Sequence, residues 1–405
     1  MNKEINFADE LETTPLGVEE ENEEYQPFDP EKISIDTKPI TMDTCLRRLE
    51  QGTIILNPDF QRNEVWTMEK KCRLIESLML KIPIPMFYVS SDEKGIFYVV
   101  DGLQRLSTIR SFVLGDQYLK TKVAEYKGKG FKLEELEFWG KQYNDLDFNN
   151  LPINIQNRIL ETGFTFTIIN PGTPEEVKRN IFKRINTGGE PLTSQEIRHA
   201  LYIGESTKLL LKLSNLNSFI LATDNSVRSE RMMDRELILR FISFTIRSYL
   251  NYPKNNDMDK FLSDTMRIIN VINDTNKKEY SKLFRDDINK EDILINDTSK
   301  LENLFSQAMK RAYDIFGKHA FRKSLPGQRR TPINKSLFEV WSVLLGRLTN
   351  SEFDKLVINK VNFIIQYSVL LSSDNFNHII SRDSLKYQSV NERYTKLTEL
   401  LNQFI

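Results

Sequence analysis

The sequence predicts an α+β protein in which a mixed half of strands and helices precedes an all-helical half. Between residues 53 and 169, short apolar runs typical of strands alternate with segments whose apolar residues recur every three or four positions. From about residue 205 onward, the helical spacing continues almost without interruption. We therefore expect two folded domains, over residues 31–205 and 206–405, with a mixed sheet in the first.

The mixed half contains four expected strands, over residues 53–56, 86–89, 96–100 and 164–169. Helices are expected over 41–49 and 67–81, after the third strand as far as Gly115, and on both sides of the Gly188-Gly189 pair. The helix that follows Gly188-Gly189 starts at a capping box formed by Thr193 and Glu196. Residues 116–150 are polar and aromatic, and we expect a hairpin or an insertion there.

The helical half shows seven clear segments and no recurring motif that would indicate a helical repeat. The expected helices cover residues 206–222, 231–250, 258–274, 298–316, 334–347, 352–371 and 389–404.

Residues 1–30 differ from the rest of the chain in charge. They contain ten acidic residues and one lysine, a net charge of −9, which leaves +8 on the remainder because the total is −1. Segments of one charge sign usually remain solvated, so we expect a disordered arm. An acidic arm on a mildly basic body could also screen an anion-binding site.

Several classes of protein are excluded by what the sequence lacks. The two cysteines, Cys45 and Cys72, provide neither a disulfide framework nor a zinc set, and the three histidines are far apart. The sequence has no phosphate-binding P-loop motif and no Gly-x-Ser-x-Gly nucleophile motif. No run approaches the roughly 18 apolar residues of a membrane span, and no apolar signal segment is present. We expect a cytoplasmic protein with no membrane partner.

The most informative stretch is a strand, turn and helix start over residues 96–108. Asp101 and Gly102 form the turn. Such a turn directs backbone N–H groups and the positive end of a helix outward, which suits a phosphate. Further donor side chains close by are Arg105, Ser107 and Thr108. The alternative is an ordinary turn, in which Asp101 caps the helix and Arg105 forms a surface ion pair.

Two other stretches offer polar groups at the ends of elements. Gln61 and Arg62 come just after an expected strand, and a planar guanidinium suits a phosphate or carboxylate, although a loop arginine is the alternative. Asn186 ends a helix before two glycines, where it is either a helix cap or an oxygen ligand for Mg²⁺.

The segment 318–335 contains no acidic residue and several cations. Clustered cations on a loop can follow a nucleic-acid backbone, and a solvated surface is the alternative. The residues that we expect to contact DNA are Arg322, Lys323, Arg329, Arg330 and Lys335.

Three ordered motifs over residues 40–205 resemble one family. They are Pro58 to Arg62 followed by Trp66, Asp101 to Thr108, and Phe182 to Glu196. Together they are similar to the specificity half of GmrSD-type modification-dependent restriction enzymes, within the ParB/sulfiredoxin-like superfamily. One residue departs from the family pattern, because Leu103 stands where the family usually has Gln. Many relatives carry a C-terminal HNH-type nuclease domain, and its His-rich signature is missing from this sequence.

The resemblance implies a ParB-like domain that binds a nucleoside triphosphate with Mg²⁺ and hydrolyses it. The catalytic residues that the resemblance implies are Asp101, Gln104 and Arg105. The implied metal ligands are Asp101 and Asn186. The implied nucleotide contacts are Gln61, Arg62, Gly102, Leu103, Gln104, Arg105, Ser107, Thr108, Arg184, Asn186 and Thr187. If the turn holds phosphate through backbone N–H groups, Leu103 is tolerable.

The leading hypothesis is therefore an NTP-binding and NTP-hydrolysing protein of a bacterial restriction or phage-defence system. Nucleotide state would control contact with DNA or with a nuclease partner protein, and the oligomeric state is open. The second hypothesis is a DNA-binding or scaffolding protein with a vestigial nucleotide site, which Leu103 favours. The third is a nuclease that acts through the ParB-like domain.

Overall fold

The computed structural model describes residues 17–19, 21, 34–56, 66–185, 192–227, 229–273, 280–281, 283–284 and 288–405. The chain divides into two compact units. We call Pro27–Leu201 the sheet unit, and Tyr202–Ile405 together with Met1–Gln26 the helical unit. The first contains a mixed sheet with helices and the second is helical, which confirms the predicted α+β class.

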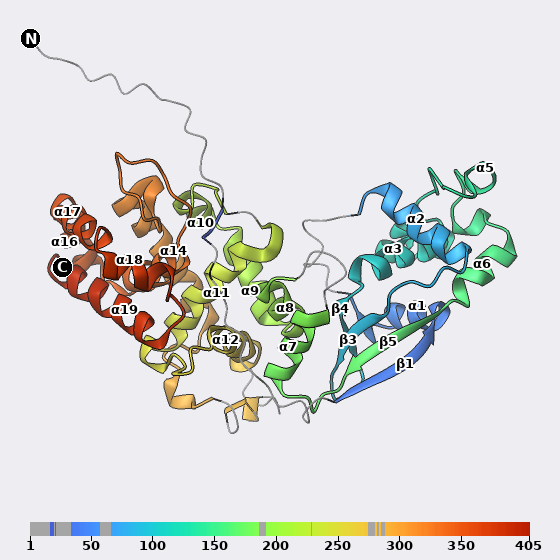
Figure 1. Cartoon of the computed structure of the whole chain (residues 1–405), viewed down its shortest axis with the longest axis horizontal. Coiled ribbons are helices and arrows are strands. Elements are labelled where there is room, and N and C mark those ends of the chain that lie inside the picture. The colour runs from blue at the N-terminus through green and yellow to red at the C-terminus, as the bar shows by residue number, and fades with distance from the viewer. Residues whose placement is uncertain are drawn as a thin grey trace, which may run out of the picture. The chain divides into compact units, whose positions relative to one another are not determined.

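The sheet has five strands in the order β1-β5-β3-β4-β2 (Figure 1). Neighbours β1 and β5 are antiparallel, as are β3 and β4, whereas β5 runs parallel to β3 and β4 parallel to β2. The strands are β1 (Ile35–Thr41), β2 (Ile54–Ile55), β3 (Phe87–Ser91), β4 (Phe97–Asp101) and β5 (Gly163–Ile169).

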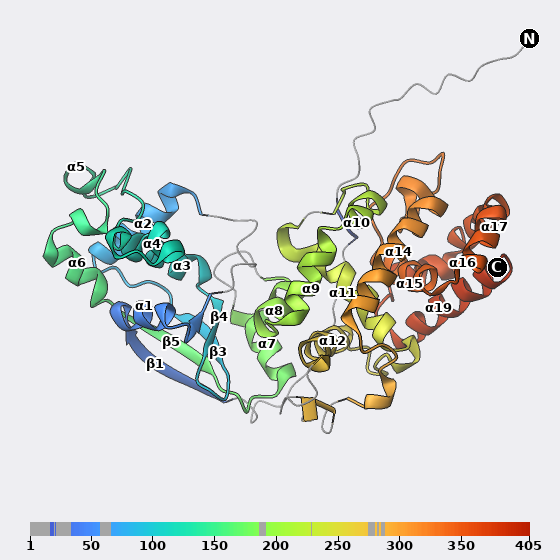
Figure 2. The same ribbon diagram turned by 180° about the vertical axis from the view of Figure 1, so that it is seen from behind.

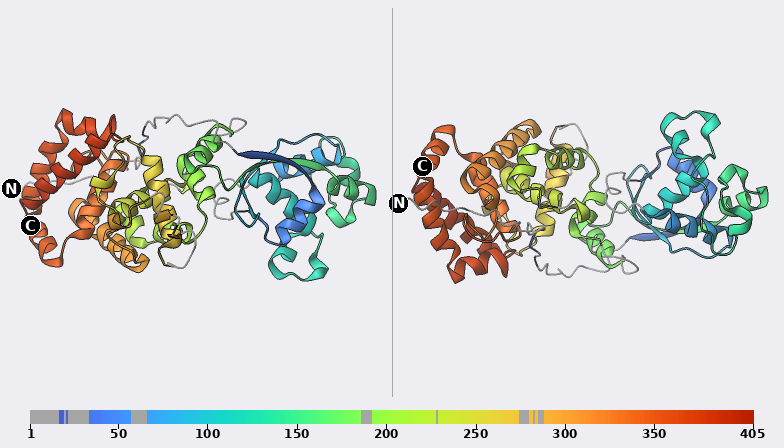
Figure 3. Two further views of the ribbon diagram at one scale, coloured as in Figure 1. Left: turned by 90° about the horizontal axis from the view of Figure 1, so that it is seen from below. Right: turned by 90° about the horizontal axis from the view of Figure 1, so that it is seen from above.

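The sequence did not predict β1, although all seven of its residues pair with β5. This strand lies at the edge of the sheet (Figure 3). Most of its side chains are exposed. It also contains Pro39, which strands tolerate mainly at edges. An exposed strand lacks the apolar alternation that marks a buried one, so its pairing depends on β5 rather than on its own pattern.

The two faces of the sheet are covered by different helices. Phe87 and Val89 of β3 belong to a large apolar core with α1 (Met42–Glu50), α2 (Met68–Met79), α3 (Leu103–Leu114) and α6 (Ile153–Leu160). On the opposite face, Val100 and Ile169 pack with α7 (Glu175–Ile185) and α8 (Ser194–Leu201). Alternate side chains along a strand point to opposite faces, so β4 contributes Val99 to the first core and Val100 to the second.

Of the two alternatives expected for residues 116–150, a hairpin or an insertion, the hairpin was wrong, because short helices and turns occupy this region. They are α4 (Asp116–Thr121), η3 (Ala124–Tyr126), α5 (Gly140–Tyr143) and η4 (Phe148–Asn150). The buried carboxylate of Glu76 on α2 accepts hydrogen bonds of 2.9, 2.8 and 3.0 Å from the backbone N–H groups of Glu137, Phe138 and Trp139. This carboxylate therefore fixes a segment that lacks regular structure of its own.

Replacing Glu76 with alanine is expected to lower the free energy of unfolding of the sheet unit by about 3 kcal/mol. Three backbone N–H groups would lose a charged acceptor, and each hydrogen bond of this kind contributes on the order of 1 kcal/mol or more. Urea unfolding measures the loss. The control is Glu69→Ala on the same helix, whose exposed ion pair with Arg73 contributes about 0.5 kcal/mol or less. Equal losses in the two variants would contradict this role for Glu76.

The helical unit centres on α11 (Met233–Ile246), α14 (Thr298–Phe316) and α15 (Lys335–Arg347), which pack on one another. The other helices are α9 (Glu205–Ser214), α10 (Asn217–Ala222), η5 (Glu230–Met232), η6 (Tyr249–Asn251), α12 (Met258–Ile272), η7 (Lys290–Asp292), η8 (Gly317–His319), α16 (Asn350–Ile358), α17 (Lys360–Leu371), α18 (Asp374–Ser381) and α19 (Tyr387–Asn402). Figure 2 shows α16, α17 and α19 together beside the C-terminus.

In the part of the chain that the structure describes, no helix is both long enough and apolar enough to cross a membrane.

Two of the helices expected from the sequence are each divided in the structure. The segment 206–222 forms α9 and α10, and the segment 352–371 forms α16 and α17. The second break falls at Asn359, whose side-chain amide donates 3.1 Å to the Lys355 carbonyl. The backbone N–H of Asn359 donates to the same carbonyl at 3.0 Å, so this residue caps the end of α16.

Candidate functional site

The turn after β4 has the strand–turn–helix form that the sequence predicted. The strand ends at Asp101, Gly102 adopts a left-handed conformation with φ of +90°, and α3 begins at Leu103. A Cβ atom built on Gly102 would lie 2.2 Å from Cδ1 of Phe87. The turn therefore requires glycine both for its backbone conformation and for its close approach to β3.

The N-terminus of α3 has no side-chain cap. Gly102 occupies the N-cap position, so the alternative in which Asp101 caps the helix is not what the structure shows. The Gly102 carbonyl accepts the first helical hydrogen bond, at 2.9 Å, from the N–H of Leu106. The N–H groups of the first turn lie before that bond and give this end of the helix its positive partial charge.

Arg105 forms the ion pair that the sequence offered as the ordinary alternative. Its Nη2 lies 2.9 Å from Oδ2 of Asp101 and donates 3.2 Å to the Met86 carbonyl, and Nη1 donates to the Pro85 carbonyl. The guanidinium also lies 4.7 Å from the centre of the Phe87 ring. Burial lowers the pKa of Arg105, and the charge of Asp101 opposes that shift. These contacts join the start of α3 to the start of β3.

The side chain of Leu103 points into the apolar core and is 6% exposed. A ligand outside the turn would therefore meet the backbone at this position, not the side chain. Thr108 is also buried, whereas Gln104 and Ser107 are half-buried. The Gln104 side chain forms no hydrogen bond with any other residue that the structure describes. Of the turn's side chains, Gln104 is thus well placed to contact a ligand without giving up an internal bond.

The third motif packs beneath the strand that leads to this turn. Ile181 and Phe182 of α7 and Ile197 of α8 share one apolar cluster with Val100 of β4. The predicted capping box at the start of α8 is confirmed, because the N–H of Thr193 donates 2.6 Å to Oε2 of Glu196, and the N–H of Glu196 donates 3.2 Å to Oγ1 of Thr193. Two of the three sequence motifs therefore meet around β4.

Some predicted site residues cannot be placed. Gln61, Arg62, Asn186 and Thr187 lie outside the described residues, and Arg184 is placed only as part of the last turn of α7. Their roles in holding phosphate or Mg²⁺ stay predictions.

The described residues contain no group of three His, Cys, Asp or Glu side chains that could hold a metal ion. Mg²⁺ bound with a nucleotide commonly takes one or two carboxylates and completes its shell with phosphates and water. The Asp101 carboxylate is 32% exposed beside the uncapped end of α3, so it fits that kind of site.

The basic segment 318–335 is largely engaged in internal contacts. Arg322 is 1% exposed and donates to the carbonyls of Lys318 and Thr331 and to Oγ of Ser226, so its guanidinium supports the fold. Four cations of this segment form ion pairs, which are Lys318 and Arg330 with Asp224, Lys323 with Glu19, and Lys335 with Glu236. Arg329 is exposed on the loop.

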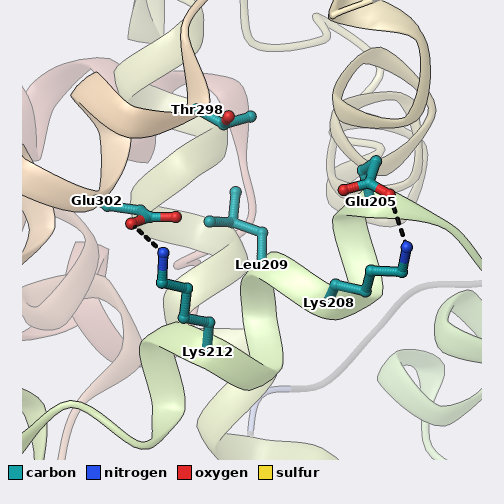
Figure 4. A pocket seen from close by; sticks show the side chains of 6 residues that line it. All are labelled: Glu205, Lys208, Leu209, Lys212, Thr298 and Glu302. Atoms are coloured by element: carbon teal, nitrogen blue, oxygen red, sulfur yellow. Dashed lines mark hydrogen bonds and ion pairs between the residues drawn. The ribbon is translucent and has the colours of Figure 1, made fainter.

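A surface hollow lies in the helical unit between α9 and the start of α14 (Figure 4). Lys208 and Lys212 line it, and they pair with Glu205 at 2.8 Å and Glu302 at 2.6 Å. Each cation is neutralised by an adjacent carboxylate, so the hollow offers an anion no uncompensated charge.

The sequence did not indicate a buried ionic cluster around Arg240 of α11. One of its ion pairs lies within the helix, at 3.2 Å to Glu236. Arg240 also contacts Glu339 of α15, at 3.5 Å, and Glu21 of the N-terminal segment. The spacing of four residues shows only the first of these pairs, because the other partners are distant in the chain.

Residues 45–203 match a family model described as the N-terminal domain of the GmrSD restriction endonuclease. The match runs from within α1 to just beyond α8, so it includes the uncapped turn and the α7–α8 pair. No curated protein matches the chain.

Proposed function

Because residues 45–203 match the family model of the GmrSD restriction endonuclease N-terminal domain, we propose that this chain is a component of a restriction or phage-defence system that binds a nucleoside triphosphate. The observation that carries the proposal is the turn at Gly102, where the start of α3 has no side-chain cap. A helix start of this kind offers backbone N–H groups and positive partial charge to a phosphate.

Backbone atoms hold the phosphates in this proposal. The first-turn N–H groups at Leu103, Gln104 and Arg105 are the donors, which is why the inward side chain of Leu103 is compatible with binding. Gln104 adds a side-chain contact and is placed to orient a water molecule for hydrolysis.

Asp101 and Arg105 act together in the proposed site. Their ion pair of 2.9 Å balances both charges when no ligand is bound. Phosphate oxygens would attract the guanidinium, which leaves the Asp101 carboxylate available to Mg²⁺. Mg²⁺ would supply neutralisation of the charge that develops on the phosphates. Asp101 then positions the metal and Arg105 stabilises the phosphates.

DNA is the proposed macromolecular partner. The segment 318–335 exposes Arg329, and its Lys323 and Lys335 form ion pairs with Glu19 and Glu236. Such cations exchange carboxylate partners for DNA phosphates without refolding.

Replacing Gln104 with alanine is expected to weaken nucleotide binding about tenfold, since one good hydrogen bond to a charged group contributes roughly 1.5 kcal/mol. The measurement is titration of ATP, GTP, CTP and UTP with Mg²⁺ into the full chain by calorimetry. The matched control is Gln117→Ala on α4, whose side chain is exposed and distant in the chain from the turn. It should leave the affinity unchanged.

Arg105→Ala separates the candidate functions. Loss of phosphate release from a folded variant supports hydrolysis at this turn. Nucleotide binding without phosphate release by the parent chain supports the second hypothesis, a DNA-binding protein with a vestigial site. Plasmid nicking that depends on Asp101 supports the third. Failure of the folded parent to bind any of the four nucleotides would refute the proposed site.

A further inference from the structure

A short acidic piece of the N-terminal segment lies against the helical unit and forms a β-bridge between Val18 and Ile333. We call residues 17–19 and 21 the arm segment. The N–H of Gly17 donates 2.9 Å to the Ser226 carbonyl, and the N–H of Glu19 donates 2.8 Å to the Ile333 carbonyl. Ile333 in turn donates 3.3 Å to the Gly17 carbonyl, and Val18 between them is buried. The arm segment therefore runs directly beside the basic segment 318–335.

Glu19 holds two groups of that basic segment. Its Oε2 lies 2.8 Å from Nζ of Lys323 and accepts a hydrogen bond of 2.7 Å from the side-chain amide of Asn334. Both side chains of the ion pair keep about a quarter of their surface exposed. This contact is therefore open to exchange with an anion from solution.

Glu21 reaches further inward, to the guanidinium of Arg240. Its side chain is 7% exposed. Burial by itself would raise the pKa of Glu21, but the charges of Arg240 and Lys335 outweigh burial and lower it. The carboxylate is thus held as an anion among cations.

The charges around Glu21 balance only when the arm segment is in place. The cluster contains three cations and two acids of the helical core, which are Arg240, Lys335 and Arg393, and Glu236 and Glu339. Glu21 supplies the third negative charge. Without the arm segment this cluster would carry a net charge of +1, and Lys323 would add a second positive charge beside it.

We propose that this surface, formed by Lys323, Lys335 and Arg240, is a binding site for the phosphates of a nucleic acid, and that the arm segment occupies it in cis. The proposal rests on the DNA binding proposed above. Glu19 and Glu21 are two positions apart in the sequence, and an extended chain covers about 7 Å over that distance, a step comparable to that between successive phosphates. The arm segment thereby imitates the spaced charges of a nucleic-acid backbone.

A nucleic acid fits this surface better than an acidic peptide does. The exposed cation Arg329 belongs to the same basic segment, which extends the positive charge beyond the two arm carboxylates. A polyanion can use that extension, whereas a short acidic peptide would only replace what the arm segment already supplies. Because the arm segment is tethered, it competes at a high effective concentration and raises the threshold for binding.

The test removes the arm's charges from the full chain. In Glu19→Gln/Glu21→Gln, binding to a fluorescent DNA duplex, measured by anisotropy at 50 to 200 mM salt, should tighten about tenfold or more. The matched control is Glu10→Gln/Glu12→Gln, which removes the same charge from the same N-terminal segment and should change affinity less than twofold. Adding Lys323→Gln/Lys335→Gln to the arm variant should cancel the gain and flatten the salt dependence.

Two further measurements protect the test against misfolding. Glu19→Gln alone alters a partly exposed pair, keeps Glu21 in place and should give a smaller gain. Hydrogen exchange of the parent chain should show the N–H of Glu19, now bonded to Ile333, exchanging faster when DNA is added.

The outcomes separate this inference from the proposed function. If the parent binds DNA and the arm and control variants bind it equally well, the arm inference is overturned and DNA binding stands. If neither the parent nor the arm variant binds DNA, both ideas of DNA binding are overturned, while the nucleotide site at Gly102 is untouched. If a glutamate-rich peptide competes for the arm variant and DNA does not, the nucleic-acid assignment is wrong.

Discussion

The Gly102→Ala variant is expected to lose about 3 kcal/mol of the free energy of unfolding of the sheet unit and to lose nucleotide binding with it. Two costs add at this position. A left-handed conformation costs a residue with a Cβ atom roughly 1 kcal/mol or more. The new methyl group would also lie 2.2 Å from Cδ1 and 2.6 Å from Cε1 of Phe87, and such overpacking typically costs about 1–3 kcal/mol.

A second glycine allows the two costs to be separated. Gly95 has a similar φ of +76°, but no atom lies within 4 Å of the Cβ position. Gly95→Ala should therefore lose only about 1 kcal/mol. Hydrogen exchange measured at increasing urea concentration distinguishes the sheet unit from the helical unit. It gives the loss of stability in Gly102→Ala and in Gly95→Ala. Adding Phe87→Leu to Gly102→Ala should restore part of the stability that Gly102→Ala removes, since it takes away the ring atoms that clash. Equal losses at the two glycines would show that the Phe87 contact is unimportant.

The second large effect is expected in the helical unit, at Glu339 of α15. This carboxylate is fully buried, and its Oε1 lies 2.7 Å from Nη2 of Arg393. Its Oε2 lies 3.5 Å from Nη1 of Arg240. Burial raises the pKa of Glu339, and the two guanidinium groups oppose the shift. Glu339→Ala should lower the free energy of unfolding by about 3–5 kcal/mol, because two buried cations lose a shared counter-charge.

Two variants show whether the charge or the shape of Glu339 matters. Glu339→Gln keeps the shape and an acceptor oxygen, and should lose less stability than Glu339→Ala. An exposed pair gives the baseline. Glu205 lies 2.8 Å from Lys208 on α9 with both side chains more than half exposed, so Glu205→Ala should cost about 0.5 kcal/mol or less. Thermal unfolding of the three variants gives the comparison, and a loss below 1 kcal/mol in Glu339→Ala would contradict a structural role for the cluster.

The structure and the sequence differ instructively at the candidate site. The motif Asp101 to Thr108 predicted a phosphate-binding turn from local features, and the left-handed Gly102 and the uncapped α3 agree with that form. The sequence offered an ion pair for Arg105 but could not show that this side chain is also bonded to the start of β3, because these two partners are about 20 residues away. Nor could it show that Leu103 faces the core, which depends on how α3 packs against the sheet.

The acidic N-terminal segment is the clearest case of a prediction that tertiary contacts refine. Charge composition predicted a solvated arm with the capacity to screen an anion site. The structure places Gly17, Val18, Glu19 and Glu21 against the helical unit, where two carboxylates meet Lys323 and Arg240. The opposite charges of the arm and the rest of the chain made a contact between the arm and a basic surface foreseeable. Only the folded structure shows that the arm pairs with Ile333.

The sequence by itself determined the features that depend on neighbours within a few residues: the α+β order of elements, the turn at Gly102 and the capping box at Thr193. Only the tertiary structure decided the pairing of β1 with β5, the support of residues 137–139 by Glu76, and the ionic cluster of Glu339. Local propensity acts through backbone conformation, which adjacent residues determine. Strand pairing and buried charge pairing are contacts between distant residues, and their partners are set by how the elements pack.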